Sequence, residues 1–223
     1  MTYEQALSMI RRHKLVAILR GVPMELSLEV ARALHRGGVR VLEFTFDHAQ
    51  SAYIEKTAEQ VRRVTAAFGD ELLVGCGTVL TAGEVRAGHE AGANLMISPN
   101  VDSEVIRLTR KLDMVSMPGA LTPTEIVNAH ALGADVVKLF PAGVLGAGYI
   151  RAVRAPLSHI PMSAVGGVSP ENVRDFLDAG VCSLGVGGEM VRKADLESGN
   201  MEALAQRAQA FVRAVQEWEE AHP

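Results

Sequence analysis

The chain contains the stretch Asp135-Val136-Val137-Lys138-Leu139-Phe140-Pro141-Ala142, in which a lysine stands in the middle of an apolar run bounded by turn residues. The run is short and rich in β-branched residues, so it predicts a buried strand. Strand alternation places Lys138 on one face together with Val136 and Phe140. We therefore expect this strand to carry a lysine into the protein interior.

A buried ammonium group is costly unless it is paired or loses its proton. Burial lowers a lysine pKa from about 10.4 toward roughly 7–8, which leaves a useful fraction of free amine at neutral pH. A free amine attacks carbonyl groups and forms a Schiff base. Lys138 is therefore a candidate nucleophile; the alternatives are a structural ion pair and a lysine that snorkels at the strand end. The other four lysines lie in polar surroundings: Lys14, Lys56, Lys111 and Lys193.

Short apolar runs of this kind recur about every 25 residues, and a helical pattern follows each of them. The eight runs are Leu15–Leu19, Val41–Phe46, Leu72–Gly77, Leu95–Ser98, Met114–Met117, Val136–Phe140, Pro161–Val165 and Ser183–Gly187. A short helix over Thr2–Arg12 precedes them, and a closing helix begins at Met201. Eight βα units in about 200 residues predict a (β/α)8 TIM barrel with an extra N-terminal helix, and a doubly wound open sheet is the alternative.

The boundaries of the predicted helices carry start and stop signals. Thr81–Glu84 and Thr122–Glu125 are each typical of a capping box, and the second has proline at the first helical position. Ser169-Pro170 predicts the start of another helix in the same way. Glycines stand where helices should end, at Gly37-Gly38, Gly92, Gly133 and Gly180.

The composition predicts a single α/β domain over residues 1–223, because this length suffices for one well-buried core. The net charge of −4 gives no electrostatic footprint for nucleic acid. The sequence shows no signal peptide and no apolar run long enough to cross a membrane. Cys76 and Cys182 lie far apart and show no metal-ligand spacing. We therefore expect a cytoplasmic protein with two reduced thiols.

In a TIM barrel the chemistry lies at the carboxyl ends of the strands. The second run carries Glu43 and Thr45, and an acid within such a run is costly when it is charged and alone. Beside Lys138, Glu43 could act as a general acid and base, or it could be no more than the ion-pair partner of the lysine. Arg20 follows the first run and is always charged. Its guanidinium group is therefore expected to bind an anion; the alternative is a solvent-exposed cation in a surface loop.

Two glycine pairs, Gly166-Gly167 and Gly187-Gly188, follow the last two predicted strands. Residues without Cβ let backbone N–H groups approach an anion closely, and a helix N-terminus near Ser169-Pro170 would add a favourable dipole. In many TIM barrels the loops after strands seven and eight hold a phosphate. The pairs therefore predict a phosphate site; the alternative is tight turns in a barrel of small residues.

In this order the motifs resemble the 2-keto-3-deoxy-6-phosphogluconate aldolase family, which includes 4-hydroxy-2-oxoglutarate aldolase and the 6-phosphogalactonate branch. The resemblance covers nearly the whole chain. It is carried by Gly38-Val39-Arg40-Val41-Leu42-Glu43, Val74-Gly75-Cys76-Gly77-Thr78-Val79-Leu80, Ile97-Ser98-Pro99, Pro118-Gly119, Lys138-Leu139-Phe140-Pro141-Ala142 and Val165-Gly166-Gly167.

The resemblance implies a class I aldolase that needs no metal and no cofactor and that is typically homotrimeric. Lys138 would form the Schiff base with the keto acid, and Glu43 would move protons through a bound water. Thr78 would help to hold the pyruvyl carboxylate, and Arg20 would bind the distal anion or carboxylate of the substrate. The remaining implied site residues are Pro99 and Phe140 as pocket lining, and Gly166, Gly167, Gly187 and Gly188 as the phosphate cradle.

The implied substrate is a 2-keto-3-deoxy-6-phospho sugar acid of the gluconate or galactonate type, cleaved to pyruvate and glyceraldehyde 3-phosphate. Cleavage of 4-hydroxy-2-oxoglutarate to pyruvate and glyoxylate is also compatible. Two positions depart from the phosphogluconate branch: Asp47 replaces an arginine that contacts the pyruvyl carboxylate, and Glu189 replaces a serine that contacts phosphate. The galactonate branch lacks that arginine and has an acid near Glu189, so the departures favour it.

Two other functions stay open from the sequence. Decarboxylation of a β-keto acid such as oxaloacetate uses the same iminium electron sink. A non-catalytic phosphate-binding barrel would use Lys138 and Glu43 only as an ion pair. Against this second alternative, both charges lie on barrel-facing positions together with Thr78 and Arg20.

Overall fold

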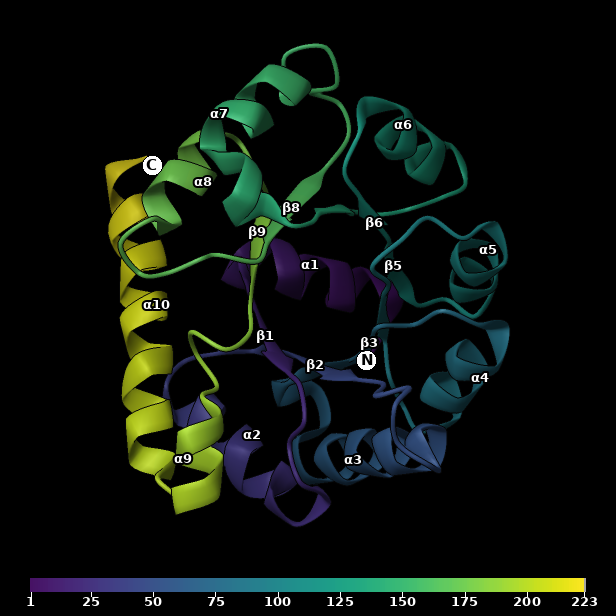
Figure 1. Cartoon of the computed structure of the whole chain (residues 1–223), viewed down its shortest axis with the longest axis vertical. Helices are drawn as coiled ribbons and strands as arrows, with labels where there is room; N and C mark the ends of the chain where they lie inside the picture. The colour runs from purple at the N-terminus through teal and green to yellow at the C-terminus, as the bar shows by residue number, and fades with distance from the viewer. Residues whose placement is uncertain (223) are drawn as a thin grey trace.

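The computed structural model describes residues 1–222 and forms a ring of parallel strands surrounded by helices (Figure 1). The strands are β1 (Leu15–Leu19), β2 (Val41–Thr45), β3 (Leu73–Gly77), β4 (Leu95–Ile97), β5 (Val115–Met117), β6 (Gly119–Ala120), β7 (Val137–Leu139), β8 (Met162–Val165) and β9 (Ser183–Val186). The α-helices are α1 (Tyr3–His13), α2 (Ser27–Arg36), α3 (Tyr53–Phe68), α4 (Ala82–Glu90), α5 (Ser103–Lys111), α6 (Pro123–Ala131), α7 (Ala142–Arg154), α8 (Val173–Asp178), α9 (Lys193–Ser198) and α10 (Met201–Ala221). The predicted TIM barrel with an extra N-terminal helix is confirmed.

Strands β5 and β6 are two parts of one barrel strand that is interrupted at Pro118. The strand order is β5-β4-β3-β2-β1-β9-β8-β7-β6, so β5 pairs with β4 while β6 pairs with β7. Proline has no N–H group and cannot continue a hydrogen-bond ladder. Its carbonyl oxygen still accepts a hydrogen bond from the backbone N–H of Lys138 at 2.9 Å. The interrupted strand therefore links the two ends of the sheet and completes the predicted set of eight.

Helix α1 lies across one end of the barrel (Figure 1). Its Ala6 and Ile10 side chains are fully buried and pack against apolar residues inside the barrel. These interior residues are Val16, Val41, Leu73, Leu95, Ile97, Val115, Met117 and Val136. Since apolar side chains fill this end, polar groups can gather at the opposite end, where the strands finish.

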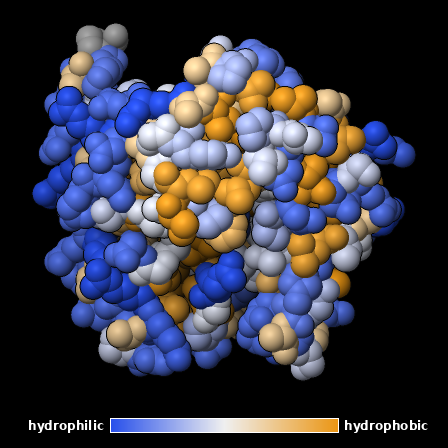
Figure 2. All heavy atoms as spheres, turned by 45° about the horizontal axis from the view of Figure 1, so that its top comes forward, coloured by the Kyte–Doolittle hydropathy of each residue, from blue (hydrophilic) through white to orange (hydrophobic). Residues whose placement is uncertain are grey.

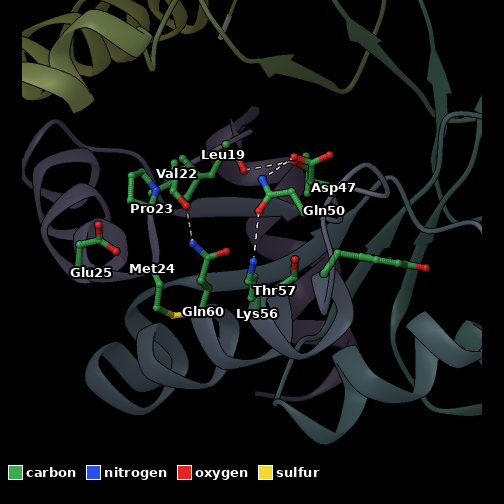
Figure 3. Close-up of a pocket in the computed structure, with 13 residues that line it drawn as sticks. Leu19, Val22, Pro23, Met24, Glu25, Asp47, Gln50, Lys56, Thr57 and Gln60 are labelled. Carbon is green, nitrogen blue, oxygen red and sulfur yellow. Dashed lines mark hydrogen bonds between the residues drawn. The ribbon is translucent and has the colours of Figure 1, made fainter.

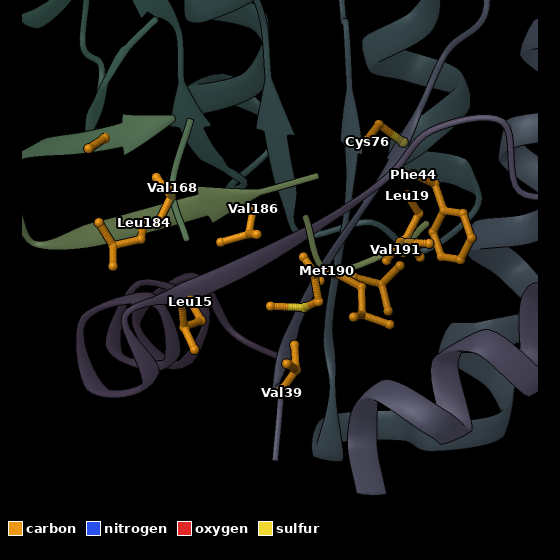
Figure 4. Close-up of a cluster of buried hydrophobic side chains, with 14 of the residues drawn as sticks. Leu15, Leu19, Val39, Phe44, Cys76, Val168, Leu184, Val186, Met190 and Val191 are labelled. Carbon is orange, nitrogen blue, oxygen red and sulfur yellow. The ribbon is translucent and has the colours of Figure 1, made fainter. Parts of the chain in front are cut away.

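A second apolar cluster fills the layer between the barrel and the outer helices, and Figure 4 shows part of it. Phe44 and Cys76 belong to this layer and alternate along their strands with the barrel-facing positions. The closing helix α10 begins at Met201, as predicted, and buries a face that includes Leu204 and Phe211. Among residues 1–222, no helix combines the length and the apolar character that a membrane span needs.

The predicted helix signals are largely confirmed. The capping boxes at Thr81 and Thr122 form, with both reciprocal hydrogen bonds present in each. One predicted start is wrong, because α8 begins at Val173 and Ser169-Pro170 belongs to a turn that precedes it. In that turn the N–H groups of Asn172 and Val173 both donate to the Ser169 carbonyl at 3.1 Å. The expected helix dipole next to the glycine pair is therefore displaced by one turn.

Candidate active site

Lys138 stands on β7 with its side chain inside the barrel and only 7% exposed. Its backbone lies between Gly119 of β6 and Ser163 of β8. Its Nζ atom lies 5.1 Å from the centroid of the Phe140 ring. Burial lowers the pKa of the Lys138 amine; the Glu43 carboxylate opposes this shift and the Arg20 guanidinium adds to it. The strand therefore holds an amine that gives up its proton more readily than an exposed lysine.

Glu43 faces the barrel interior from β2 and is 2% exposed. Burial raises the pKa of its carboxyl group, and the positive charges of Lys138 and Arg20 oppose that shift. Throughout residues 1–222, no carboxylate oxygen lies within 4.0 Å of the Lys138 amine. The simple ion pair that the sequence left open is therefore not formed, and two ionisable groups with shifted pKa values share one buried space.

Gly77 makes room for the Glu43 carboxylate. A Cβ atom built on Gly77 would overlap Oε1 of Glu43, because β3 lies next to β2 at this level of the barrel. The glycine is therefore required for volume, since its φ angle lies outside the left-handed region. In the sequence this glycine stands out only as part of the motif Val74–Leu80. A glycine inside a strand is the signal that marks such a close approach.

A pocket of about 360 Å3 opens at the carboxyl ends of the strands and brings all the predicted site residues together. They are Arg20, Glu43, Thr78, Pro99, Lys138, Phe140, Gly166, Gly167, Gly187 and Gly188. Ile18, Val165, Val168, Gly185 and Val186 also line it and were not predicted. Ile18 could have been found from strand alternation, because it lies two residues before Arg20.

The Gly166-Gly167 pair is fixed by its backbone. The φ angles of +90° and +71° lie in the left-handed region that favours glycine. A Cβ atom on Gly167 would also come within 2.7 Å of the Cα atom of Gly143, at the start of α7. The Gly143 N–H donates to the Gly166 carbonyl at 2.8 Å, so α7 and this loop are held together at the pocket.

The Gly187-Gly188 pair is less constrained. A Cβ atom on Gly188 would meet no atom within 4 Å, and neither φ angle is in the left-handed region. No packing requirement therefore explains the absence of a side chain at Gly188. Open space in front of this pocket-lining backbone would let an anion reach the backbone N–H groups.

The two departures from the phosphogluconate pattern lie in different places. Asp47 does not line the Lys138 pocket, because its carboxylate accepts hydrogen bonds from the Ala49 N–H at 3.2 Å and from Nε2 of Gln50 at 2.7 Å. Glu189 does line the pocket, but its side chain is 58% exposed and forms a long ion pair of 3.9 Å with Arg192. The Asp47 charge is therefore held away from the site, and part of the Glu189 charge is offset at the rim.

Glu84 ties the loops after β2 and β3 together beside the pocket. Its carboxylate is fully buried and accepts hydrogen bonds from the Thr81 N–H at 3.0 Å and from the Tyr53 hydroxyl at 2.9 Å. Nε2 of His48 lies 2.7 Å from the same carboxylate. The sequence predicts the capping box at Thr81, but it does not predict the contacts of Glu84 with His48 in the β2–α3 loop and with Tyr53 at the start of α3. Thr78, three residues before this capping box, has a φ of +56°, which is uncommon for a residue other than glycine.

The described part of the chain holds no group of three or more His, Cys, Asp or Glu side chains that is arranged to bind a metal. Cys76 and Cys182 are both free thiols. Cys76 is fully buried, and burial raises the pKa of its thiol, so it is a packing residue rather than a reactive one.

Residues 7–207 match the family model of the KDPG and KHG aldolases. The chain belongs to this aldolase family. It is 36% identical over 204 residues to the 2-dehydro-3-deoxy-6-phosphogalactonate aldolase of Escherichia coli (strain K12), a match that covers 91% of this chain and 95% of the relative. It is 39% identical over 201 residues to the probable 2-dehydro-3-deoxy-6-phosphogalactonate aldolase of Rhizobium meliloti (strain 1021), with 90% of each chain covered.

The solved structure of native KDPGal superposes on this aldolase with a TM-score of 0.83 at 36% identity, covering 92% of this chain and 96% of that chain. The fold and the family predicted from the sequence are thus confirmed, and so is the assignment to the class I pyruvate aldolases, which are carbon–carbon lyases.

Proposed function

We propose that this aldolase cleaves a 2-keto-3-deoxy-6-phospho sugar acid of the galactonate type to pyruvate and glyceraldehyde 3-phosphate. The observation that carries the proposal is the single pocket that joins a buried amine, a buried carboxyl group and two glycine loops. Both relatives described above are named for the 6-phosphogalactonate substrate. The position of Asp47 outside the pocket also favours this branch, because no charged group replaces the arginine of the phosphogluconate branch.

In this proposal Lys138 is the nucleophile. Its amine attacks the C2 carbonyl of the keto acid, and loss of water gives an iminium ion. The positively charged iminium withdraws electrons, so the C3–C4 bond can break as the C4 hydroxyl loses its proton. The electron pair of that bond moves into the enamine of pyruvate, and the aldehyde leaves. Burial favours the attack because it increases the fraction of Lys138 present as the free amine.

Glu43 is the proposed general acid and base. Its ionised form accepts the C4 hydroxyl proton, directly or through a water molecule, and its protonated form then delivers a proton to C3 of the enamine. A carboxyl group with a raised pKa suits both steps, because its two protonation states are then closer in population near neutral pH. Hydrolysis of the resulting imine releases pyruvate and restores the free amine.

The other pocket residues are proposed to hold the two ends of the substrate. Thr78 can donate its hydroxyl hydrogen to the pyruvyl carboxylate, while Pro99 and Phe140 cover the apolar side of the pyruvyl group. Arg20 can pair with the distal anion. The backbone N–H groups of the two glycine loops, Gly166-Gly167 and Gly187-Gly188, are the proposed phosphate donors.

A steady-state comparison of substrates tests the proposal. The phosphorylated galactonate and gluconate epimers, an unphosphorylated analogue and 4-hydroxy-2-oxoglutarate should be compared by kcat/KM. We expect the galactonate epimer to be preferred and the unphosphorylated analogue to be poor. Equal turnover with and without phosphate would contradict the phosphate site. Release of carbon dioxide from oxaloacetate without any aldolase activity would instead establish the decarboxylase alternative.

Gly188→Val gives a residue-level test of the phosphate site. A Cβ atom at position 188 meets no atom within 4 Å and the φ angle is not left-handed, so the fold should persist while the valine side chain fills space in the pocket. We expect KM for the phosphorylated keto acid to rise at least tenfold, with KM for free pyruvate almost unchanged. Gly148→Val is the matched control, since Gly148 also has open space around it but lies outside the pocket. An equal effect of both variants on KM would contradict the role of the loop.

We further propose a homotrimer, as the family resemblance implies. In Figure 2 the molecule is turned so that the top of Figure 1, where α6 and α7 lie, faces the reader, and hydrophobic surface gathers on this side. The exposed large hydrophobic residues include Leu121, Val127, Phe140 and Val144, and Val144 is 83% exposed. Such a group of apolar side chains is typical of a surface covered by another copy of the chain. Light scattering should give three times the 23.8 kDa chain mass, and Val144→Asp should lower it.

We also propose a cytoplasmic location. Cys76 and Cys182 remain free thiols in the structure, which suits a reducing compartment. Fractionation of the cells that express the protein would test this location, and recovery in a secreted or membrane fraction would contradict it.

A further inference from the structure

A second cavity of about 560 Å3 lies at the same end of the barrel and shares no lining residue with the Lys138 pocket. The connection from β1 to α2 forms one side of it, and the first turns of α3 form the other (Figure 3). Leu19 and Thr45, at the ends of β1 and β2, also line it. The proposed aldolase reaction assigns no role to this cavity.

Gln60 fixes a hydrogen-bond acceptor in this cavity. Its side chain is 8% exposed, and its Nε2 atom donates to the Val22 carbonyl at 2.8 Å and to Oγ of Ser27 at 3.0 Å. The orientation of the amide follows from its partners, because a carbonyl can only accept and the Ser27 hydroxyl already donates to the Met24 carbonyl at 2.8 Å. Both bonds therefore need the NH2 group, which leaves Oε1 of Gln60 as an acceptor on the cavity side (Figure 3).

Thr57 adds a second polar group next to this acceptor. It lies three residues before Gln60 on the same face of α3, and its side chain is 4% exposed. Thr57 lines the cavity, and its hydroxyl, which forms no side-chain hydrogen bond within residues 1–222, is open to the cavity rather than sealed inside the protein. The Thr57 hydroxyl and the Gln60 oxygen therefore both face the cavity with capacity for further hydrogen bonds, and a polar occupant can pair with them.

The charges around the cavity stand at its mouth. Glu25 and Lys56 are exposed, and the half-buried Asp47 is bonded to Gln50. The mouth therefore carries two carboxylates and one ammonium group, a balance that does not favour an anion. The buried polar groups are a neutral acceptor and a hydroxyl, and these pair with hydroxyl groups. The apolar walls at Leu19, Val22, Pro23 and Met24 suit the C–H faces of a carbohydrate.

We propose that this cavity is a binding site for a neutral polyhydroxylated molecule of sugar size. Hydroxyl groups of the occupant donate to Oε1 of Gln60 and pair with the Thr57 hydroxyl, and its C–H face packs on the apolar wall. The cavity is large enough for such a molecule, since small-molecule sites usually span about 300–1,000 Å3. The second cavity adjoins the Lys138 pocket at the end of β1. Leu19 and Gly21 line the second cavity, and Arg20, which stands between them in the chain, lines the Lys138 pocket.

The test is an NMR titration of the full-length protein with D-galactose and, separately, with glycerol, in saturating pyruvate. The side-chain amide of Gln60 is the probe, assigned by its loss in Gln60→Glu. We expect a saturable shift of this amide with both compounds. Because pyruvate is proposed to occupy only the Lys138 pocket, the shift should be the same with and without pyruvate.

Thr57→Val and Thr65→Val form a matched pair of variants. Thr65 also stands on α3, and its buried hydroxyl has no partner, but it lies outside the cavity. We expect Thr57→Val to weaken binding of D-galactose at least fivefold, since a ligand hydroxyl then loses its partner, while Thr65→Val leaves Kd within a factor of two. The absence of a saturable shift, or equal Kd values for the two variants, would overturn the proposal. The spectrum of each unliganded variant shows whether its fold is retained.

Discussion

Gly77→Ala should damage catalysis while it leaves the barrel intact. A Cβ atom at position 77 takes the space of the Glu43 carboxylate, so this side chain must turn away from its place in the Lys138 pocket. The clashing atoms, Cγ, Cδ and Oε1 of Glu43, all belong to the side chain and not to the backbone, so rotation of that side chain can relieve the clash while the strand remains in place. The substitution therefore moves the proposed general acid and base without removing it.

The expected size of the effect follows from the role of Glu43. Loss of a general acid or base usually costs about 10²–10⁴ in kcat, or roughly 3–5 kcal/mol of transition-state stabilisation. Stability should change far less. Crowding in a packed interior lowers the free energy of unfolding by about 1–3 kcal/mol. A Gly→Ala exchange at a compatible backbone position raises it by about 0.4–1 kcal/mol. We therefore expect kcat to fall at least 100-fold, while Tm falls by no more than about 10 °C.

A comparison of four proteins isolates the effect: the parent, Gly77→Ala, Glu43→Gln and the double variant. Turnover of the phosphorylated keto acid is followed by pyruvate release. If both substitutions act on one carboxylate, the double variant should be no slower than Glu43→Gln alone, because the two losses are not additive. Gly83→Ala is the control, since its Cβ atom would make only an ordinary contact of 3.7 Å. A Gly77→Ala enzyme with kcat within a factor of two of the parent would refute the reasoning.

Three further outcomes are expected. Borohydride reduction in the presence of pyruvate should add a pyruvyl mass to the peptide that contains Lys138, and a label on any other lysine would rule out its role. The rate of imine formation should rise with pH and reach its midpoint below 10.5, because burial lowers the pKa of Lys138 and the amine form prevails above that pKa. Glu43→Gln should shift this midpoint to lower pH and Arg20→Gln should shift it to higher pH, since the carboxylate raises and the guanidinium lowers the pKa of Lys138; shifts of the same sign would contradict the assignment. Activity should survive a strong chelator, and a loss restored by a divalent ion would indicate a metal-dependent aldolase.

The sequence by itself determined the barrel and predicted which residues line the Lys138 pocket. Strand alternation is a local property, so it could place Lys138 and Glu43 on barrel-facing positions. Because parallel strands in a closed ring all finish at one end, the residues at those ends had to meet there. The starts of the helices at Thr81 and Thr122 were predictable for a related reason, since a capping box forms within four residues of chain.

Other features depend on which atoms meet across the barrel, and these only the tertiary structure decided. Gly77 and Glu43 stand on different strands, so nothing local shows that one makes room for the other. The direction of Asp47 follows from its bonds in the β2–α3 loop, and its sequence position alone suggested a place in the pocket. The pKa shifts of Lys138 and Glu43 likewise need burial and charges contributed by several strands. The acceptor that Gln60 presents to the second cavity exists only because the β1–α2 loop, far from it in the chain, fixes its amide.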